Sequence, residues 1–280
     1  MIEAKLHDGA AIPVEVSGGG PAVLLPVNPI PVTGAKADEL RAWGVDPALG
    51  RTLIDGLADA YTVVAFDYEG HVLAHPKPAT LTPDAVAADV LAVADAAGVD
   101  RFAYYGYSWL ALAGLQLALR TDRLTALAMG GYPPIGGPYA EMLQVTRATH
   151  EEALHPAPTP AAAADWNANP DDFDWSTVEM TMTPDQTRQF VTLYTALDGF
   201  DDTRVRLTCP RLCFAGSADV IAYGARWGDA RVDIAGPLLT RGAELAAAGW
   251  QVRVLDGLDH TAAMQPGAVL PILRPFLDSL

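Results

Sequence analysis

The chain has 280 residues, half of them hydrophobic, and its 34 acidic and 18 basic residues give a formal net charge of −16. A chain this rich in apolar residues can fill a folded core, which excludes a largely disordered protein. The negative charge predicts repulsion from nucleic acid and from anionic membrane surfaces, so we expect neither as a partner.

The first half of the chain alternates strand-like and helix-like segments. Residues 2–7 and 12–16 alternate apolar and polar side chains around Asp8-Gly9, which predicts a hairpin. Continuous apolar runs at 22–25 and 61–67 are typical of strands buried on both faces. The other elements that we expect in this half are helices over 37–43, 49–60 and 83–97 and loops over 26–50 and 68–81.

Ser108 lies at the most informative position of the sequence. Residues 101–107 are aromatic and apolar, as in a buried strand, and residues 109–119 are rich in alanine and leucine, as in a helix. A serine between them stands on a sharp strand-to-helix turn, with its hydroxyl exposed at the carboxyl edge of a sheet. Gly106 leaves room for the tight backbone. Open α/β sheets bind their ligands at this edge.

The alternation is interrupted once in the second half of the chain. A strand is expected over 124–129, after which residues 133–206 lose the strand pattern and contain helical stretches at 139–152 and 184–197. Strand and helix signals then resume, with strands over 211–215 and 251–255 and helices over 237–248 and 266–280. We therefore predict an α/β protein with a mostly parallel, twisted sheet and helices on both faces. Its core comprises residues 1–132 and 207–280, and a helical lid is inserted after the sixth strand, over 133–206.

Two later loops supply partners for a serine nucleophile. A serine needs a base to take its proton, and the base needs a third group that holds its tautomer. Asp219 follows the strand at 211–215, and His260 follows the strand at 251–255. The rivals of Asp219 are Asp229 and Asp233. The other histidine that follows a strand is His71, which we keep as an alternative that lines the site.

Taken together, these motifs resemble those of the α/β-hydrolase fold superfamily. The resemblance rests on four segments, which are Gly106-Tyr107-Ser108, Gly216-Ser217-Ala218-Asp219, Asp259-His260 and Asp67-Tyr68-Glu69-Gly70-His71. It implies a catalytic triad with Ser108 as nucleophile, Asp219 as orienting acid and His260 as general base. The chain departs from the family at Leu110, where the family prefers a small residue.

The same resemblance implies an oxyanion hole with two backbone donors. One donor is the N–H of Trp109, which follows the nucleophile. The second comes from the loop after the strand at 22–25, where family members often carry His-Gly and this chain has Pro26-Val27-Asn28-Pro29. Because proline has no N–H, the donor is expected to be Asn28, with Val27 as the alternative.

These residues lead to a hypothesis of function. We expect a serine hydrolase that cleaves an ester, thioester or lactone of a small, largely apolar substrate, with Tyr107, Tyr132 and Trp175 as candidates for substrate contact. The alternative for such aromatic residues is that they only pack the lid onto the core. The alternatives for function are a cofactor-free C–C hydrolase, a lyase or an acyltransferase on the same fold, or a ligand-binding protein without catalysis.

No cofactor, metal or membrane attachment is expected. The sequence has no dinucleotide or phosphate-loop motif and no metal-ligand cluster, and Cys209 and Cys213 are expected as free thiols, too far apart on one strand for a disulfide. The first residues lack the pattern of a signal peptide, and the most apolar helix is shorter than the roughly 20 residues of a membrane span. We therefore expect a soluble, cytoplasmic protein.

Overall fold

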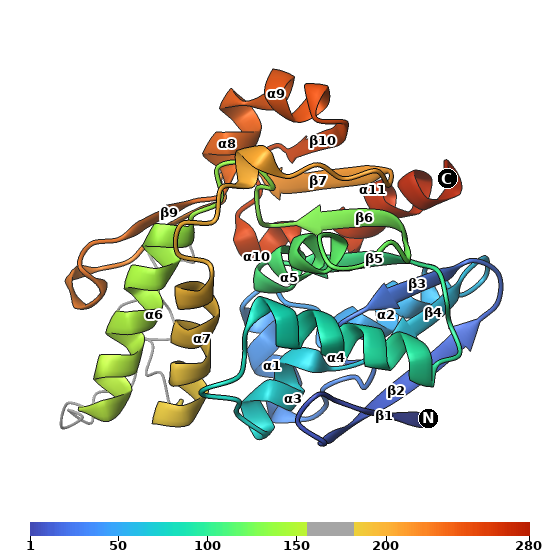
Figure 1. The fold of residues 1–280 in the computed structure, drawn as a ribbon, viewed down its shortest axis with the longest axis horizontal. Coiled ribbons are helices and arrows are strands. Elements are labelled where there is room, and N and C mark those ends of the chain that lie inside the picture. The colour runs from blue at the N-terminus through green and yellow to red at the C-terminus, as the bar shows by residue number, and fades with distance from the viewer. Residues whose placement is uncertain (156–181) are drawn as a thin grey trace.

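A computed structural model describes residues 1–155 and 182–280, and these residues build one mixed sheet with helices on both faces (Figure 1). The sheet has eight strands in the order β1-β2-β4-β3-β5-β6-β7-β10. Its strands are β1 (Ile2–Lys5), β2 (Ala11–Gly18), β3 (Ala22–Leu25), β4 (Thr62–Ala65), β5 (Phe102–Tyr107), β6 (Leu124–Gly130), β7 (Arg211–Gly216) and β10 (Trp250–Leu255). The pairs β1–β2 and β2–β4 are antiparallel and all other pairs are parallel, which confirms the predicted α/β architecture and its opening hairpin.

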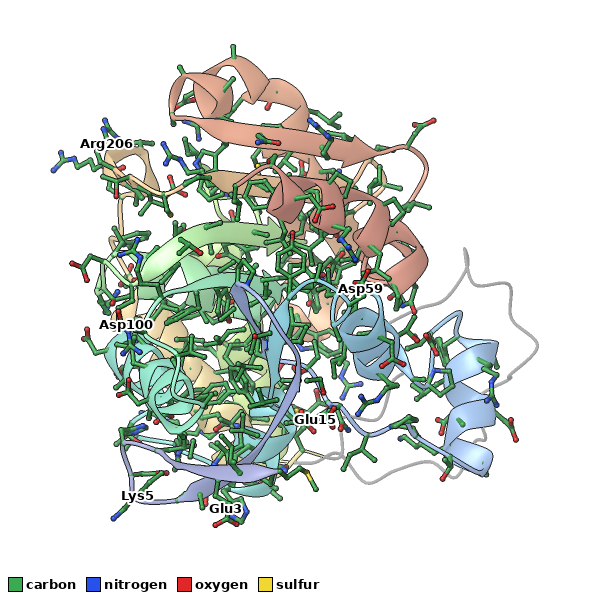
Figure 2. All side chains as sticks on the ribbon, turned by 90° about the vertical axis from the view of Figure 1, so that its right-hand side faces the viewer. Glu3, Lys5, Glu15, Asp59, Asp100 and Arg206 are labelled. Carbon is green, nitrogen blue, oxygen red and sulfur yellow. The ribbon has the colours of Figure 1, made fainter. Side chains whose placement is uncertain are left out.

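Two hydrophobic clusters, one on each face, hold the sheet between helices. Side chains alternate across a strand, so Tyr104 of β5 joins one cluster while Tyr105 and Tyr107 join the other. The first cluster contains the apolar faces of α4 (Pro83–Ala96), α5 (Trp109–Ala118), α8 (Ala235–Thr240) and α9 (Gly242–Ala247). The second contains those of α2 (Leu49–Asp55), α10 (His260–Ala263) and α11 (Pro266–Asp278). Figure 2 shows charged residues such as Lys5, Asp100 and Arg206 at the periphery of the molecule.

The interruption after β6 is confirmed as a helical insertion. Its described elements are α6 (Tyr139–Leu154), α7 (Pro184–Ala196) and a short 3₁₀ helix at Asp202–Arg204. Helices α6 and α7 pack against each other beyond the end of the sheet at which β6 and β7 finish (Figure 1). The insertion therefore stands over the carboxyl edge of the parallel strands.

The structure corrects several predicted elements. Residues 68–81 are not all loop, because α3 (Tyr68–Ala74) forms where the Asp67 carboxylate accepts the Gly70 N–H as a helix cap. Helix α2 ends at Asp55 rather than near residue 60, with Gly56 as its C-cap. The helix expected over 237–248 is two helices, α8 and α9, separated at Arg241. The expected helix near 37–43 is present as α1 (Ala35–Ala42).

A small second sheet was not predicted at all. Strands β8 (Val220–Ala222) and β9 (Arg231–Asp233) pair antiparallel, with a 3₁₀ turn at Ala225–Trp227 between them. Each strand is only three residues long, so its apolar pattern is too short to distinguish it from a loop.

Within the described ranges, no helix has the length and apolar character required to cross a membrane.

A substitution at Phe214 tests how much the packing between the central strands and the helices contributes to stability. Its ring is fully buried on β7 and stacks on Tyr105 at a centroid distance of 6.2 Å. We expect Phe214→Ala to lower the free energy of unfolding by about 3–5 kcal/mol, because a large core cavity remains. Urea denaturation measures this loss. Leu119→Ala is the control, since Leu119 is 40% exposed and should change stability by less than about 0.5 kcal/mol.

Candidate active site

Ser108 forms the turn between β5 and α5 in a backbone conformation that is rare for a residue with a side chain. Its φ is 56° and its ψ is −130°, and its N–H donates to the Gly130 carbonyl at 2.8 Å. Gly106 is required beneath this turn, because a Cβ there would lie 2.3 Å from the Leu110 carbonyl oxygen. Leu110 itself is buried and is accommodated, with its carbonyl accepting the Tyr104 hydroxyl at 2.9 Å.

Asp219 and His260 meet at the ends of β7 and β10. The two carboxylate oxygens of Asp219 lie 3.0 and 2.9 Å from Nδ1 of His260. Asp219 is fully buried, and its backbone carbonyl accepts the N–H groups of Ile234 and Ala235. A buried carboxylate on Nδ1 fixes the tautomer in which Nδ1 carries a proton and Nε2 is a free base.

The local backbone structure places Asp219 and His260 within hydrogen-bond distance of each other. Asp259 caps the short helix α10 by accepting the Ala262 N–H at 2.7 Å, which places His260 at the first helical position. Gly216 ends β7 where a Cβ would lie 1.9 Å from the Leu258 carbonyl oxygen, so only glycine lets the two loops approach this closely. The three predicted residues therefore come from three strand ends of one sheet.

The alternatives to these residues lie elsewhere. The Asp233 carboxylate accepts the Gly236 N–H at the start of α8, and Asp229 occupies a turn with a φ of 53°. Neither forms a hydrogen bond with His260 in the part of the chain that the structure describes. His71 is buried on α3, is not among the residues lining the site cavity, and its Nε2 has no partner among the described residues.

A cavity of about 380 Å³ opens beside Ser108 and His260. Its wall is predominantly apolar, and its further described lining residues are Trp109, Tyr132, Met142, Val145, Thr146, Thr149, Met182, Thr187, Phe190, Tyr194, Ile221, Tyr223, Trp227, Val232 and Ile234. The lining threonines already use their hydroxyls inside the protein. Thr149 accepts the Trp227 indole N–H at 2.9 Å, and Thr146 donates to the Leu143 carbonyl at 3.1 Å. These described lining residues include no lysine, arginine or carboxylate side chain, and His260 is the only histidine among them.

Ser108 and His260 face this cavity without a direct hydrogen bond. Both residues are described, and no contact within hydrogen-bond distance joins the Ser108 hydroxyl to the His260 ring. Catalytic hydrogen bonds of this kind are commonly long when no substrate is bound and tighten in the substrate complex.

The three predicted substrate contacts have different positions. Tyr132 lines the cavity, is 2% exposed, and its hydroxyl has no partner among the described residues. Tyr107 is not part of the cavity wall, because its hydroxyl donates to the His260 carbonyl at 2.7 Å from beneath the site. Trp175 lies outside the described residues.

The predicted oxyanion donors differ in the hydrogen bonds that they already make. The Trp109 N–H belongs to the first turn of α5, where helical N–H groups lack a backbone acceptor, and it has none in the described chain. In the loop after β3, the Val27 N–H is already bound to the Leu25 carbonyl at 2.9 Å. The Asn28 side-chain oxygen accepts the Ile30 N–H at 2.9 Å, while the backbone N–H of Asn28 has no acceptor among the described residues. Asn28 is exposed and is not among the described residues that line the cavity.

Much of the cavity wall was missed by the sequence reasoning. Met142, Val145, Thr146 and Thr149 line it from α6, and their spacing of three, four and seven residues marks one helix face. That spacing was a usable signal. The contribution of β8 and β9 had no comparable signal, since it depends on the pairing of two three-residue strands.

No cluster of three or more histidine, cysteine or carboxylate side chains that could hold a metal ion occurs in residues 1–155 and 182–280. Cys209 and Cys213 are free, as predicted, and burial raises the pKa of both thiols, that of Cys213 to about 12.

Solved structures resemble this architecture, although no family model and no curated protein matches the chain. An epoxide hydrolase from Vigna radiata matches with a TM-score of 0.58 and 16% identity, over 99% of this chain and 97% of its own. An esterase from Thermogutta terrifontis gives 0.57 and 17%, over 99% and 98%. Epoxide hydrolase A from Mycobacterium thermoresistibile gives 0.56 and 20%, over 99% and 98%. The chain therefore has the α/β-hydrolase fold, as the resemblance implied, while identities this low leave the reaction to be argued from the site.

The strain at Ser108 gives a test of its backbone conformation. A side chain at a φ of 56° costs of the order of 1–3 kcal/mol, and glycine avoids that cost. We expect Ser108→Gly to be more stable than Ser108→Ala by about 1 kcal/mol in urea denaturation. At Ala88, an exposed position inside α4, Ala→Gly should have the opposite effect and destabilise by about 0.5–1 kcal/mol. Equal stability of the two Ser108 variants would show that the turn is unstrained.

Proposed function

We propose that the protein is a serine hydrolase that cleaves a neutral, largely apolar ester, thioester or lactone through an acyl-enzyme on Ser108. The observation that carries this proposal is the Asp219–His260 pair, which opens onto the cavity that also contains the strained Ser108 turn. A base with a fixed tautomer beside an exposed hydroxyl is the arrangement that nucleophilic serine chemistry requires.

The proposed reaction proceeds in two halves. His260 Nε2 takes the proton of the Ser108 hydroxyl as Oγ bonds to the substrate carbonyl carbon, and the resulting oxyanion is stabilised by the N–H groups of Trp109 and Asn28. The carbon–leaving group bond then breaks, and His260 returns the proton to the departing alcohol or thiol. In the second half His260 deprotonates water, which attacks the acyl carbon and releases the acid and Ser108.

The cavity supports an uncharged substrate with apolar bulk. Its described wall carries no lysine, arginine or carboxylate, and its threonine hydroxyls are already bonded within the protein. A charged group buried there would lose its hydration without a compensating partner. About 380 Å³ lies within the ordinary range of small-molecule sites.

The identity of residue 108 favours esters over epoxides. A serine oxygen that opened an epoxide would leave an ether on the protein, and an ether has no carbonyl for water to attack. An acyl-serine is an ester, which water cleaves with the help of His260. With serine at the turn, the covalent route thus gives turnover on acyl substrates and only a dead-end alkylation on epoxides.

Ser108→Ala is the direct test. We expect hydrolysis of p-nitrophenyl butyrate to fall by at least about 10³-fold, because the nucleophile is lost, with an unchanged circular dichroism spectrum. A fluorophosphonate should label the wild-type protein at Ser108 and leave the variant unlabelled, as mass spectrometry of peptides would show. Labelling of neither protein, or ester cleavage that survives in the variant, would contradict the acyl-enzyme. Substrate panels that also contain epoxides and β-diketones separate the ester reaction from ring opening and C–C cleavage.

A substitution at Met142 tests whether the cavity binds the acyl chain of the substrate. This half-buried residue lines the cavity from α6, and Met142→Trp adds volume inside it. We expect kcat/KM on p-nitrophenyl octanoate to fall by about 10-fold or more relative to the acetate, since added bulk excludes a long chain. Arg147→Trp, on the exposed side of the same helix, is the control. A chain-length preference that does not change in Met142→Trp would place the acyl group elsewhere.

A further inference from the structure

We propose that Arg51 is the positioning residue of the oxyanion hole, holding the loop after β3 so that the Asn28 N–H points at the reacting carbonyl. This inference rests on the proposed serine hydrolase function and deepens it. Arg51 does not line the cavity, so its action is indirect and passes through the main chain of residues 26–30.

Arg51 joins three separate parts of the fold. From α2 its guanidinium forms a bidentate pair with Glu15 of β2, at 2.8 and 2.7 Å. The nitrogen that makes the 2.7 Å contact also donates to the carbonyl oxygen of Pro29 at 2.9 Å. The loop after β3 is thereby tied both to the helix that follows it and to the antiparallel strand of the sheet.

The hydrogen bond from Arg51 to Pro29 lies next to the proposed oxyanion donor of this loop. Pro29 directly follows Asn28, whose N–H is the donor left in this loop once Val27 is bound to Leu25. Strands β3 and β5 are parallel neighbours, and Asn28 and Ser108 each follow the carboxyl end of one of them, so the two residues belong to the same edge of the sheet. A displacement of the loop at Pro29 therefore moves the donor relative to the nucleophile.

The loop is also held by the buried Pro29 and by the Val32 N–H, which donates to the Pro47 carbonyl at 2.9 Å. Asn28 between them is exposed, and its side-chain oxygen accepts the Ile30 N–H of its own loop. Gly50 allows the start of α2 to pass directly over the loop, since a Cβ there would lie 2.0 Å from the Asn28 carbonyl oxygen. This close passage brings the following residue, Arg51, within reach of Pro29.

The opposite charges of Arg51 and Glu15 stabilise their ion pair at neutral pH. The hydrogen bonds from Arg51 lower the pKa of Glu15, so the pair stays ionised at neutral pH. Both side chains are partly buried, with 31% and 22% of their surfaces exposed. A planar guanidinium with two parallel hydrogen bonds fixes orientation as well as distance, which a lysine ammonium does not.

The chain contains a matched control at another place in the fold. Arg274 of α11 forms a bidentate pair with Asp59 at 2.6 and 3.2 Å and donates to the Gly56 carbonyl at 3.1 Å. Its side chain is 30% exposed, almost as much as that of Arg51. It lies near the start of β4, at the amino ends of the parallel strands, and the carboxylates Glu15 and Asp59 occupy separate places in Figure 2.

The experiment compares Arg51→Ala, Arg51→Lys and Arg274→Ala in the full chain, with p-nitrophenyl butyrate as substrate. We expect Arg51→Ala to lower kcat by about 10- to 100-fold, less than the loss of a donor itself, with KM changed by less than about 2-fold. Arg51→Lys should recover part of kcat, because an ammonium can still donate to Pro29. Arg274→Ala should leave kcat unchanged, even where its melting temperature falls as far as that of Arg51→Ala.

A second measurement separates the oxyanion hole from general loosening. An alkylboronic acid that bonds to Ser108 places an oxygen in the oxyanion hole, so its inhibition constant should rise in Arg51→Ala in proportion to the loss of kcat. Glu15→Gln, which keeps Arg51 but removes the charge that aligns it, should give a smaller loss of kcat and a smaller rise of the inhibition constant. This variant serves as the test if Arg51→Ala does not fold.

Unchanged kcat in the Arg51 and Glu15 variants, or equal losses of kcat in Arg51→Ala and Arg274→Ala, would overturn the positioning role of Arg51 and leave the serine hydrolase proposal standing. A wild-type enzyme without Ser108-dependent activity would overturn both proposals.

Discussion

The buried Asp219 carboxylate is the constraint around which the site is arranged. A carboxylate with no exposed surface is stable only when its oxygens are hydrogen-bonded, and here the ring of His260 supplies that contact at 2.9 and 3.0 Å. The loops after β7 and β10 must therefore close on each other, which explains why Gly216 touches Leu258 and why α10 begins at His260. The same contact orients the base and holds together the end of the sheet.

A second hydrogen bond connects this contact with the serine turn. Tyr107 precedes Ser108 on β5, and its hydroxyl reaches across to the His260 carbonyl. Its ring needs the space left by Gly130 and Gly131, where a Cβ would come within 2.6 Å of it. Tyr107, which was expected to contact substrate, thus links the strand before Ser108 to the main chain of His260, and its ring explains the glycines at 130 and 131.

The sequence predicted the parts of the site that depend on local order along the chain. Ser108 was identifiable because an aromatic strand changes to an alanine-rich helix at that residue, and Asp219 and His260 because each closely follows an apolar strand. The parts that depend on distant contacts were not predictable in the same way. Strand β8 exists only through its pairing with β9, and the hydrogen-bond partner of the Tyr107 hydroxyl lies 153 residues away along the chain. The hydrogen bond from the Val27 N–H to the Leu25 carbonyl, on which the proposal of Asn28 over Val27 rests, was likewise not predictable from the residue types.

The sheet and the insertion contribute different parts of the candidate site, and this explains why the fold alone does not determine which reaction is catalysed. The proposed nucleophile, base and orienting acid come from strand ends of the sheet, while much of the apolar wall comes from α6, α7 and the β8–β9 pair. Substitutions in these walls change which substrates fit the cavity without moving the three strand ends. The same fold therefore occurs in proteins described as epoxide hydrolases and as an esterase, at 16–20% identity to this chain. The reaction is then decided at single positions of the sheet edge. On the proposed covalent route, a serine at residue 108 gives an intermediate that water can cleave only if that intermediate is acyl, and this chemical restriction, rather than the resemblance of fold, is the basis for proposing an ester as substrate.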